Sequence, residues 1–150
     1  MTTRRPTPAP PLPGLSPEAA QRLATTLADR RARGSDNGPR DPALAVWTYD
    51  ADRATPLSRW SAPSRVAARL DGWLRSEVVR RLLSPYDAGP QTALVVWERT
   101  GALRLRPDDL AWYAAWLRHA PTAAPPPLLV VTHTGWVSVP DGTTGRRARP

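Results

Sequence analysis

Three short apolar runs constrain the fold of this chain more than any other feature. They are residues 43–49 (ALAVWTY), 93–97 (ALVVW) and 128–132 (LLVVT). Each run has the length of a strand, and a continuous apolar run is typical of a strand that is covered on both faces. A Thr-Gly pair and another strand-like run follow the second and the third, which predicts two hairpins. The similarity of the three runs is either chance among Val-rich strands or the trace of an internal duplication.

Helical signals lie before and between these runs. Ser16 is a favourable N-cap, and the apolar residues after it recur with helical spacing, so a helix is predicted over residues 17–33. A second helix is predicted over residues 61–83, where Gly72 indicates a bend or a close approach. A third is predicted over residues 107–119, with acids in its first turn and basic residues in its last.

The order of these elements favours an α+β fold. Residues 43–139 contain a βαββαβ series, the order of the ferredoxin-like sandwich, with one extra C-terminal strand and one preceding N-terminal helix. Right-handed crossovers place both long helices of such a sandwich on one face of the sheet. The alternative is a small three-layer α/β domain with a parallel centre.

Composition divides the chain into five parts. Five of the first 14 residues are Pro, so residues 1–15 are expected to form a disordered Pro/Arg-rich arm. The N-terminal helix at 16–34 is followed by a polar linker at 35–42 and a single α+β domain at 43–140. Residues 141–150 are expected to form a disordered basic tail.

The net charge of +8 is concentrated at the two ends of the chain. All 21 basic residues are Arg, as codon usage in a GC-rich genome would produce, so the absence of Lys is weak evidence for guanidinium chemistry. Residues 1–40 carry seven arginines and three acids, and residues 140–150 carry three arginines and one acid. Residues 41–139 carry 11 arginines and nine acids, so the central domain is close to neutral.

The missing residue types exclude several kinds of site. Without Cys there is no disulfide, thiolate metal site or Cys nucleophile, and without Lys there is no P-loop lysine or Schiff base. His119 and His133 are the only histidines and lack metal-ligand spacing, and the pair Asp108-Asp109 is explained by a helix start. We therefore expect no metal and no cofactor.

The chain has no apolar run of the ~18–20 residues that a membrane span needs, and no apolar segment follows its basic start. These features predict a soluble cytoplasmic protein with no membrane partner.

Seven Trp and no Phe make the indoles the large aromatic groups of this protein. Trp47, Trp73 and Trp97 are expected in the core, whereas Trp60 and Trp136 lie beside loops and are ambiguous.

The third helix presents two apolar faces. Trp112, Trp116 and His119 fall opposite the stripe formed by Leu110, Tyr113, Ala114 and Leu117. If that stripe faces the sheet, the two indoles are covered by the helix at 17–33 or by another subunit, or they form an exposed platform for a partner peptide or an unstacked base. These three residues are the candidate partner-binding site.

Arginines form a second candidate site. Arg65, Arg69 and Arg80 share one face of the helix predicted at 61–83, and such a row can track phosphates. Arg146, Arg147 and Arg149 in the C-terminal tail are further candidate phosphate contacts. The alternative is a solvated helix face, because Asp71 and Glu77 lie in the same segment and offset part of the charge.

The preferred hypothesis from these patterns is a non-catalytic protein-interaction or self-association module with flexible basic arms. Its partner would be another protein or a second copy of the chain, bound by aromatic burial with an Arg rim. The alternative is a nucleic-acid-binding accessory protein that contacts phosphates through its arms and one helix face. A third hypothesis is a small enzyme that uses Glu98, His133 or the turn with Asp50 and Asp52.

Overall fold

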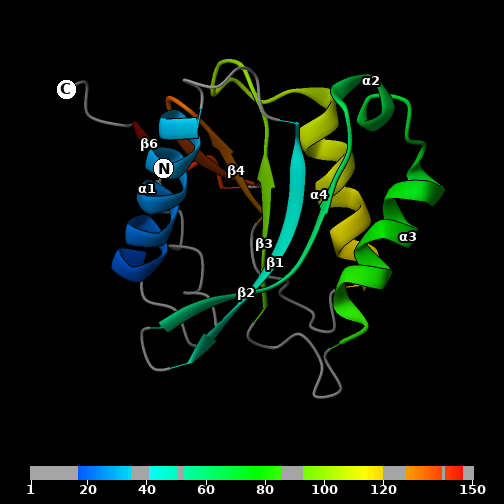
Figure 1. The fold of residues 1–150 in the computed structure, drawn as a ribbon, viewed down its shortest axis with the longest axis horizontal. Helices are drawn as coiled ribbons and strands as arrows, with labels where there is room; N and C mark the ends of the chain where they lie inside the picture. Colours follow the sequence, from blue (N-terminus) through cyan, green and yellow to red (C-terminus); the bar gives the residue numbers. More distant parts are fainter. Residues whose placement is uncertain are drawn as a thin grey trace, which may run out of the picture.

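The computed structural model of the 150-residue chain describes residues 17–34, 41–50, 53–85, 93–119, 128–139 and 141–146. The arm predicted at residues 1–15 lies outside the described residues, as do positions 35–40 of the predicted linker and the last four residues of the tail. In the described part, a six-stranded sheet has helices on both of its faces (Figure 1).

The sheet is mixed and has the strand order β2-β1-β3-β4-β5-β6. Its strands are β1 (Ala43–Asp50), β2 (Arg53–Ser61), β3 (Ala93–Glu98), β4 (Leu128–Thr132), β5 (Gly135–Val139) and β6 (Thr144–Arg146). Strands β3 and β4 run parallel, and the other neighbouring strands run antiparallel. The parallel pair follows from the connection between its strands, which carries a helix across the sheet.

Four helices of the described chain cover the sheet: α1 (Pro17–Gly34), α2 (Ser64–Ala67), α3 (Gly72–Leu83) and α4 (Pro107–His119). One face packs against α2, α3 and α4, and the opposite face packs against α1 (Figure 1). Successive residues of β3 point to opposite faces of the sheet. Val95 belongs to the core under α2, α3 and α4, and Leu94 belongs to the core under α1. The prediction that the central strands are buried on both faces is confirmed.

An α+β fold is confirmed, whereas the ferredoxin-like order is not. The difference arises because β3 lies between β1 and β4, and because a strand not predicted, β2, pairs with the outer side of β1. The helices α2, α3 and α4, which occupy the two predicted helical segments, lie on one face as expected, and α1 adds a layer on the other face. The layers of the described part therefore match the three-layer alternative, with the parallel pair in the middle of the sheet.

Only two residues separate β2 from β1, and β2 forms one edge of the sheet. It contains Pro56, which lacks a backbone donor and is tolerated at edges and bulges. The register shifts at this point, because Val46 pairs with Ser58 and Trp47 pairs with Pro56, which leaves Leu57 as the extra residue of a bulge.

The helix predicted at residues 61–83 is wrong as a single element. Ser61 is the last residue of β2, and the segment after it contains α2 and α3, which residues 68–71 separate. The break lies at Asp71, whose side chain accepts a hydrogen bond of 2.8 Å from the backbone N–H of Leu74 and so caps α3. The Gly72 signal therefore marks a helix start rather than a bend.

One of the two predicted hairpins is confirmed. Strands β4 and β5 join through Thr132↔Gly135, and Gly135 has a φ of 153° with the backbone of Gly145 so close that a Cβ would clash with it. The first hairpin is wrong, because residues 99–106 form a loop instead of a second strand. Residues 144–146, expected within the disordered tail, form β6 against β5.

Candidate interaction surfaces

Two of the alternatives considered for the Trp112 and Trp116 indoles are wrong: they form no exposed platform, and α1, the helix predicted at 17–33, does not cover them because it packs on the opposite face of the sheet. Trp112 is 1% exposed and Trp116 is 0% exposed, and both lie in the core between α4 and the sheet. The helix α4 has the predicted bounds but the opposite phase, since Leu110 and Leu117 of the stripe expected inside are 52% and 42% exposed. A buried indole is no platform, so these two residues are core residues.

Aromatic packing explains the phase of α4. The Trp112 ring lies 5.6 Å from that of Trp60 and 5.2 Å from that of Trp97, which are the two residues that flank Leu44 across the sheet. Two indoles bury roughly 300–500 Å², worth about 8–12 kcal/mol at ~25 cal/mol per Å², against about 1.5–3 kcal/mol for each leucine. The helix therefore turns its indoles toward the sheet and its leucines outward.

His119 does not extend an aromatic platform. It is half-buried, and its Nε2 lies 2.7 Å from Oγ of Ser76 in α3. A hydrogen bond from Nη1 of Arg118 to the carbonyl of Gly72, at 3.3 Å, lies beside it. These two contacts fix the last turn of α4 beside the first five residues of α3.

We call the exposed large apolar residues of α3 and α4 the helical face. Trp73, the most exposed large apolar residue of the described chain at 70%, lies next to Gly72 at the junction between the helices, and Leu74 follows it. Leu110 and Leu117 contribute from α4. The prediction that Trp73 is a core residue is wrong, because it lies on the first turn of α3 on the side away from the sheet.

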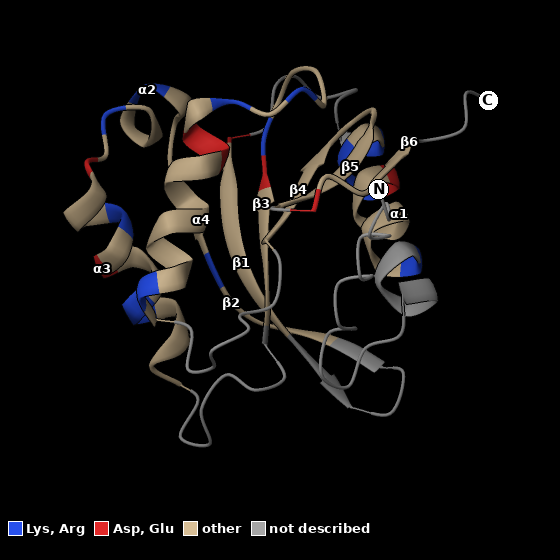
Figure 2. Ribbon diagram, turned by 180° about the vertical axis from the view of Figure 1, so that it is seen from behind, with Lys and Arg blue, Asp and Glu red and all other residues tan. Residues whose placement is uncertain are grey.

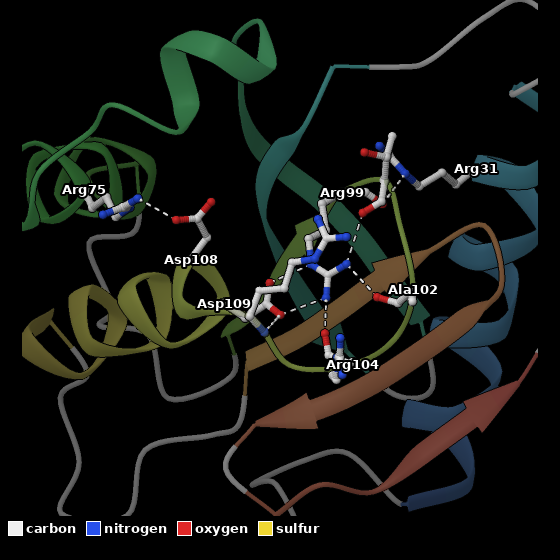
Figure 3. Close-up of polar contacts among 9 residues, drawn as sticks. Arg31, Arg75, Arg99, Ala102, Arg104, Asp108 and Asp109 are labelled. Carbon is white, nitrogen blue, oxygen red and sulfur yellow. Dashed lines mark hydrogen bonds and ion pairs between the residues drawn. The ribbon is translucent and has the colours of Figure 1, made fainter.

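A buried ion pair organises the opposite end of α4 (Figure 3). Nε and Nη2 of Arg99 donate to the two carboxylate oxygens of Asp109 at 2.7 and 2.8 Å. The remaining Arg99 donors bind the carbonyls of Thr100, Ala102 and Arg104 at 2.9–3.1 Å. All five N–H groups of the guanidinium are therefore satisfied, as a buried cation requires.

The Arg99–Asp109 ion pair also explains why residues 99–106 do not form the second strand of the predicted hairpin. The carbonyls of residues 100, 102 and 104 are bound by Arg99, so they do not pair with a neighbouring strand. Asp109 also accepts from the backbone N–H of Arg106 at 2.9 Å, which is the capping role expected for an acid in the first turn. From the other face of the sheet, Nε of Arg31 in α1 donates to the carbonyl of Arg99 at 2.9 Å. The loop is thus held from both helical layers.

The predicted arginine row does not exist as one helix face. Arg65 lies on α2 and Arg69 lies after it, whereas Arg80 lies on α3 beyond the break. Arg80 is also engaged, because its Nε donates to Glu77 at 2.9 Å. Arg65 and Arg69 are exposed, and so is Arg146 on β6, whereas Arg147 and Arg149 lie outside the described residues.

The described part of the chain contains no candidate metal centre. Its residues contain no group of three or more His, Cys, Asp or Glu side chains that could hold a metal ion. Glu98 lies 3.8 Å from Arg59, and His133 is exposed in the β4–β5 turn. Among the described residues, no helix is long and apolar enough to cross a membrane.

Comparison with known proteins returned no matching family model, no similar curated protein and no similar solved structure.

Proposed function

We propose that this chain is a non-catalytic cytoplasmic module that binds protein through the helical face, with a second copy of the chain as the partner to test first. The observation that carries the proposal is the 70% exposure of Trp73 beside the α3–α4 junction. Indoles are enriched at the centres of protein interfaces, where one residue can contribute 2 kcal/mol or more.

The geometry around Trp73 supports this use. The contacts of Arg118 with Gly72 and of His119 with Ser76 hold the two helices together, so the apolar groups are presented on a fixed surface. A rigid surface loses little conformational freedom on binding. The helix α3 also carries Arg80 and Arg81 with their partner Glu77, charged residues of the kind that form the polar rim around an apolar interface centre.

The test is the concentration dependence of the sedimentation coefficient of the full chain between about 1 μM and 1 mM, the range of weak to moderate dimers. Trp73→Gln, and separately Leu110→Gln with Leu117→Gln, are expected to weaken association at least about 30-fold, as loss of about 2 kcal/mol implies. Leu57→Gln with Leu105→Gln is the matched control, because these leucines are 45% and 41% exposed but lie on β2 and the 99–106 loop.

Self-association that is unchanged by the helical-face substitutions, or equally weakened by the control, would contradict the proposal. A chain that stays monomeric over the whole range would exclude a second copy as the partner.

A further inference from the structure

Arginines lie along the edge of the sheet that is formed by the ends of the strands. They come from α1, α2, the segment after α2, the loop 99–106 and β6. The register places the ends of β2 and β3 beside the start of β1, since Ser61 and Glu98 both pair with Ala43. The end of β4 and the start of β5 lie at the same edge, and Arg146 at the end of β6 pairs with Gly135. The loop 99–106, α2 and the last turn of α1 are attached to this edge, where the parallel strands end. Figure 2 shows arginine positions along it, from α2 through the loop before α4 to the end of α1.

We call this surface the basic edge and define it by six exposed arginines: Arg33, Arg65, Arg69, Arg104, Arg106 and Arg146. Among the described residues, none of these six guanidinium groups forms an ion pair with a carboxylate. The acids at the start of α4 are occupied, Asp109 by Arg99 and Asp108 by Arg75 at 3.3 Å. Of the remaining acids near this edge in the described chain, the exposed Asp41 lies two residues before β1, the exposed Asp71 lies two residues after Arg69, and Glu98 at the end of β3 lies 3.8 Å from Arg59. The surface therefore carries a local excess of positive charge, since its six exposed arginines outnumber Asp41, Asp71 and Glu98, although the central domain is nearly neutral.

Two of these arginines are carried by a fixed backbone. Arg104 and Arg106 lie on the loop whose carbonyls are bound by Arg99, and Arg104 itself supplies one of those carbonyls at 3.0 Å. The Arg106 side chain lies against Gly101, whose φ of 96° favours glycine. A preordered loop presents its cations with little further loss of conformational entropy on binding.

The dimensions of the edge fit a long polyanion. Six strands at a spacing of ~4.8 Å extend over about 24 Å. Duplex DNA carries about one phosphate per 1.7 Å of its axis, so it offers more phosphates over that length than the edge has cations. Guanidinium groups bind phosphate oxygens in bidentate geometry. Binding of single strands relies on several stacked aromatic side chains. The exposed large apolar residues of the edge in the described chain, Val66 and Leu105, have no ring, and the exposed His133 supplies a single imidazole.

We infer that the basic edge binds the phosphate backbone of double-stranded DNA without reading its sequence. The inference does not rest on the helical face, which lies on the outer side of α3 and α4. Each arginine that contacts a phosphate adds about one unit to the slope of log affinity against log salt concentration. The affinity of the full chain for DNA is therefore expected to fall steeply between about 50 and 200 mM salt.

The test measures fluorescence anisotropy of a labelled duplex of about 24 bp, long enough to span the edge, with three full-length proteins. The edge variant combines Arg65→Gln, Arg69→Gln and Arg104→Gln. The control variant combines Arg22→Gln, Arg80→Gln and Arg81→Gln, which removes the same charge from exposed positions on α1 and α3. The edge variant is expected to lose at least tenfold in affinity and about 2–3 units of salt slope, and the control to lose less than one unit.

Three results would overturn the inference: no duplex binding by the natural chain at 50 mM salt, equal losses in both variants, or binding to phosphatidylserine vesicles with none to DNA. Equal losses mean that net charge alone attracts the duplex, and the vesicle result assigns the edge to a membrane surface. If the edge variant does not fold, as judged by its circular dichroism, the single change Arg104→Gln serves instead, with an expected loss of about one slope unit.

Discussion

Arg99 is the residue whose role was least visible in the sequence. Its side chain satisfies Asp109 and three loop carbonyls, and it thereby replaces the second strand of a predicted hairpin. The sequence pattern that could have predicted this role is a charged residue directly after a buried strand, Arg99, which stands ten residues before an acid in the first turn of a helix, Asp109. The spacing did not reveal the Arg99–Asp109 pair, because each segment had another explanation. The Thr-Gly pair after Arg99 was explained by a hairpin turn, and Asp109 was explained by the start of a helix.

The first residue-scale prediction concerns Asp109. Asp109→Ala leaves Arg99 buried at 4% exposure without its carboxylate, and removal of one partner of a buried pair costs about 3–5 kcal/mol. Asp108→Ala is the neighbouring control, expected to cost about 1 kcal/mol or less, because the Asp108 side chain is half exposed. Urea unfolding of the two variants measures both free energies. Equal losses would mean that Arg99 does not depend on Asp109.

The second residue-scale prediction concerns Glu77. The hydrogen bond from Arg80, together with a second from Arg81, lowers the pKa of Glu77 from 4.5 to about 2. Because the folded pKa is the lower one, the stabilisation is complete above pH 4.5 and is lost as the pH falls to about 2. An NMR titration of the Glu77 carboxyl carbon measures this pKa. The same titration of the Arg80→Gln variant is expected to move the midpoint upward, and a midpoint near 4.5 in the natural chain would contradict the contact.

At the scale of elements, a continuous apolar run was sufficient to predict a buried strand, whereas the pattern of a helix was not sufficient to predict which of its faces is buried. Strands β1, β3 and β4 were predicted from their Val-rich sequences, because burial on both faces leaves no ambiguity of phase. Strand β2 carries Pro56 and several polar residues, and it is specified by pairing with β1 rather than by its own pattern. The helix α4 was predicted with its bounds but reversed, because both of its faces are apolar and only the larger area of the indoles decides between them.

The element-scale prediction compares two indoles. Trp112→Ala removes a ring that is in contact with Trp60 and Trp97, and it is expected to cost about 3–5 kcal/mol of unfolding free energy. Trp73→Ala lies on the surface of the adjacent helix and is expected to change stability by no more than about 0.5 kcal/mol. Thermal and urea unfolding distinguish the two. Similar costs for both would place Trp73 in the core and remove the basis of the helical face.

At the scale of the whole molecule, the described chain has two cores of unequal composition. The core under α3 and α4 contains three indoles from the sheet and helices, namely Trp97, Trp112 and Trp116. On the other face, α1 contributes Ala24, Leu27 and Ala28. The sequence predicted the helix α1 and its narrow apolar stripe. It did not predict where α1 packs, because the sheet face that α1 covers is formed by four strands that are distant in the sequence.

The whole-molecule prediction follows from this asymmetry. The few small apolar groups of α1 are expected to let it open more readily than the central strands, so its amides exchange with deuterium before those of β3 and β4. Leu27→Ala is expected to accelerate exchange in α1 far more than in α4. Uniform acceleration throughout the chain would mean that α1 unfolds only together with the rest.

The orientation of α4 is the claim on which the helical face depends, and the absence of Cys from the chain allows a direct measurement. Ala114→Cys and Ala115→Cys place thiols at adjacent positions, of which 114 is exposed and 115 is 2% exposed. The rate of reaction with a thiol reagent is measured at low protein concentration for each variant. We expect the thiol at 114 to react about 100-fold faster than the thiol at 115, which becomes accessible only when the structure opens locally. A faster reaction at 115 would contradict the account, because α4 would then present its indoles and not its leucines to solvent.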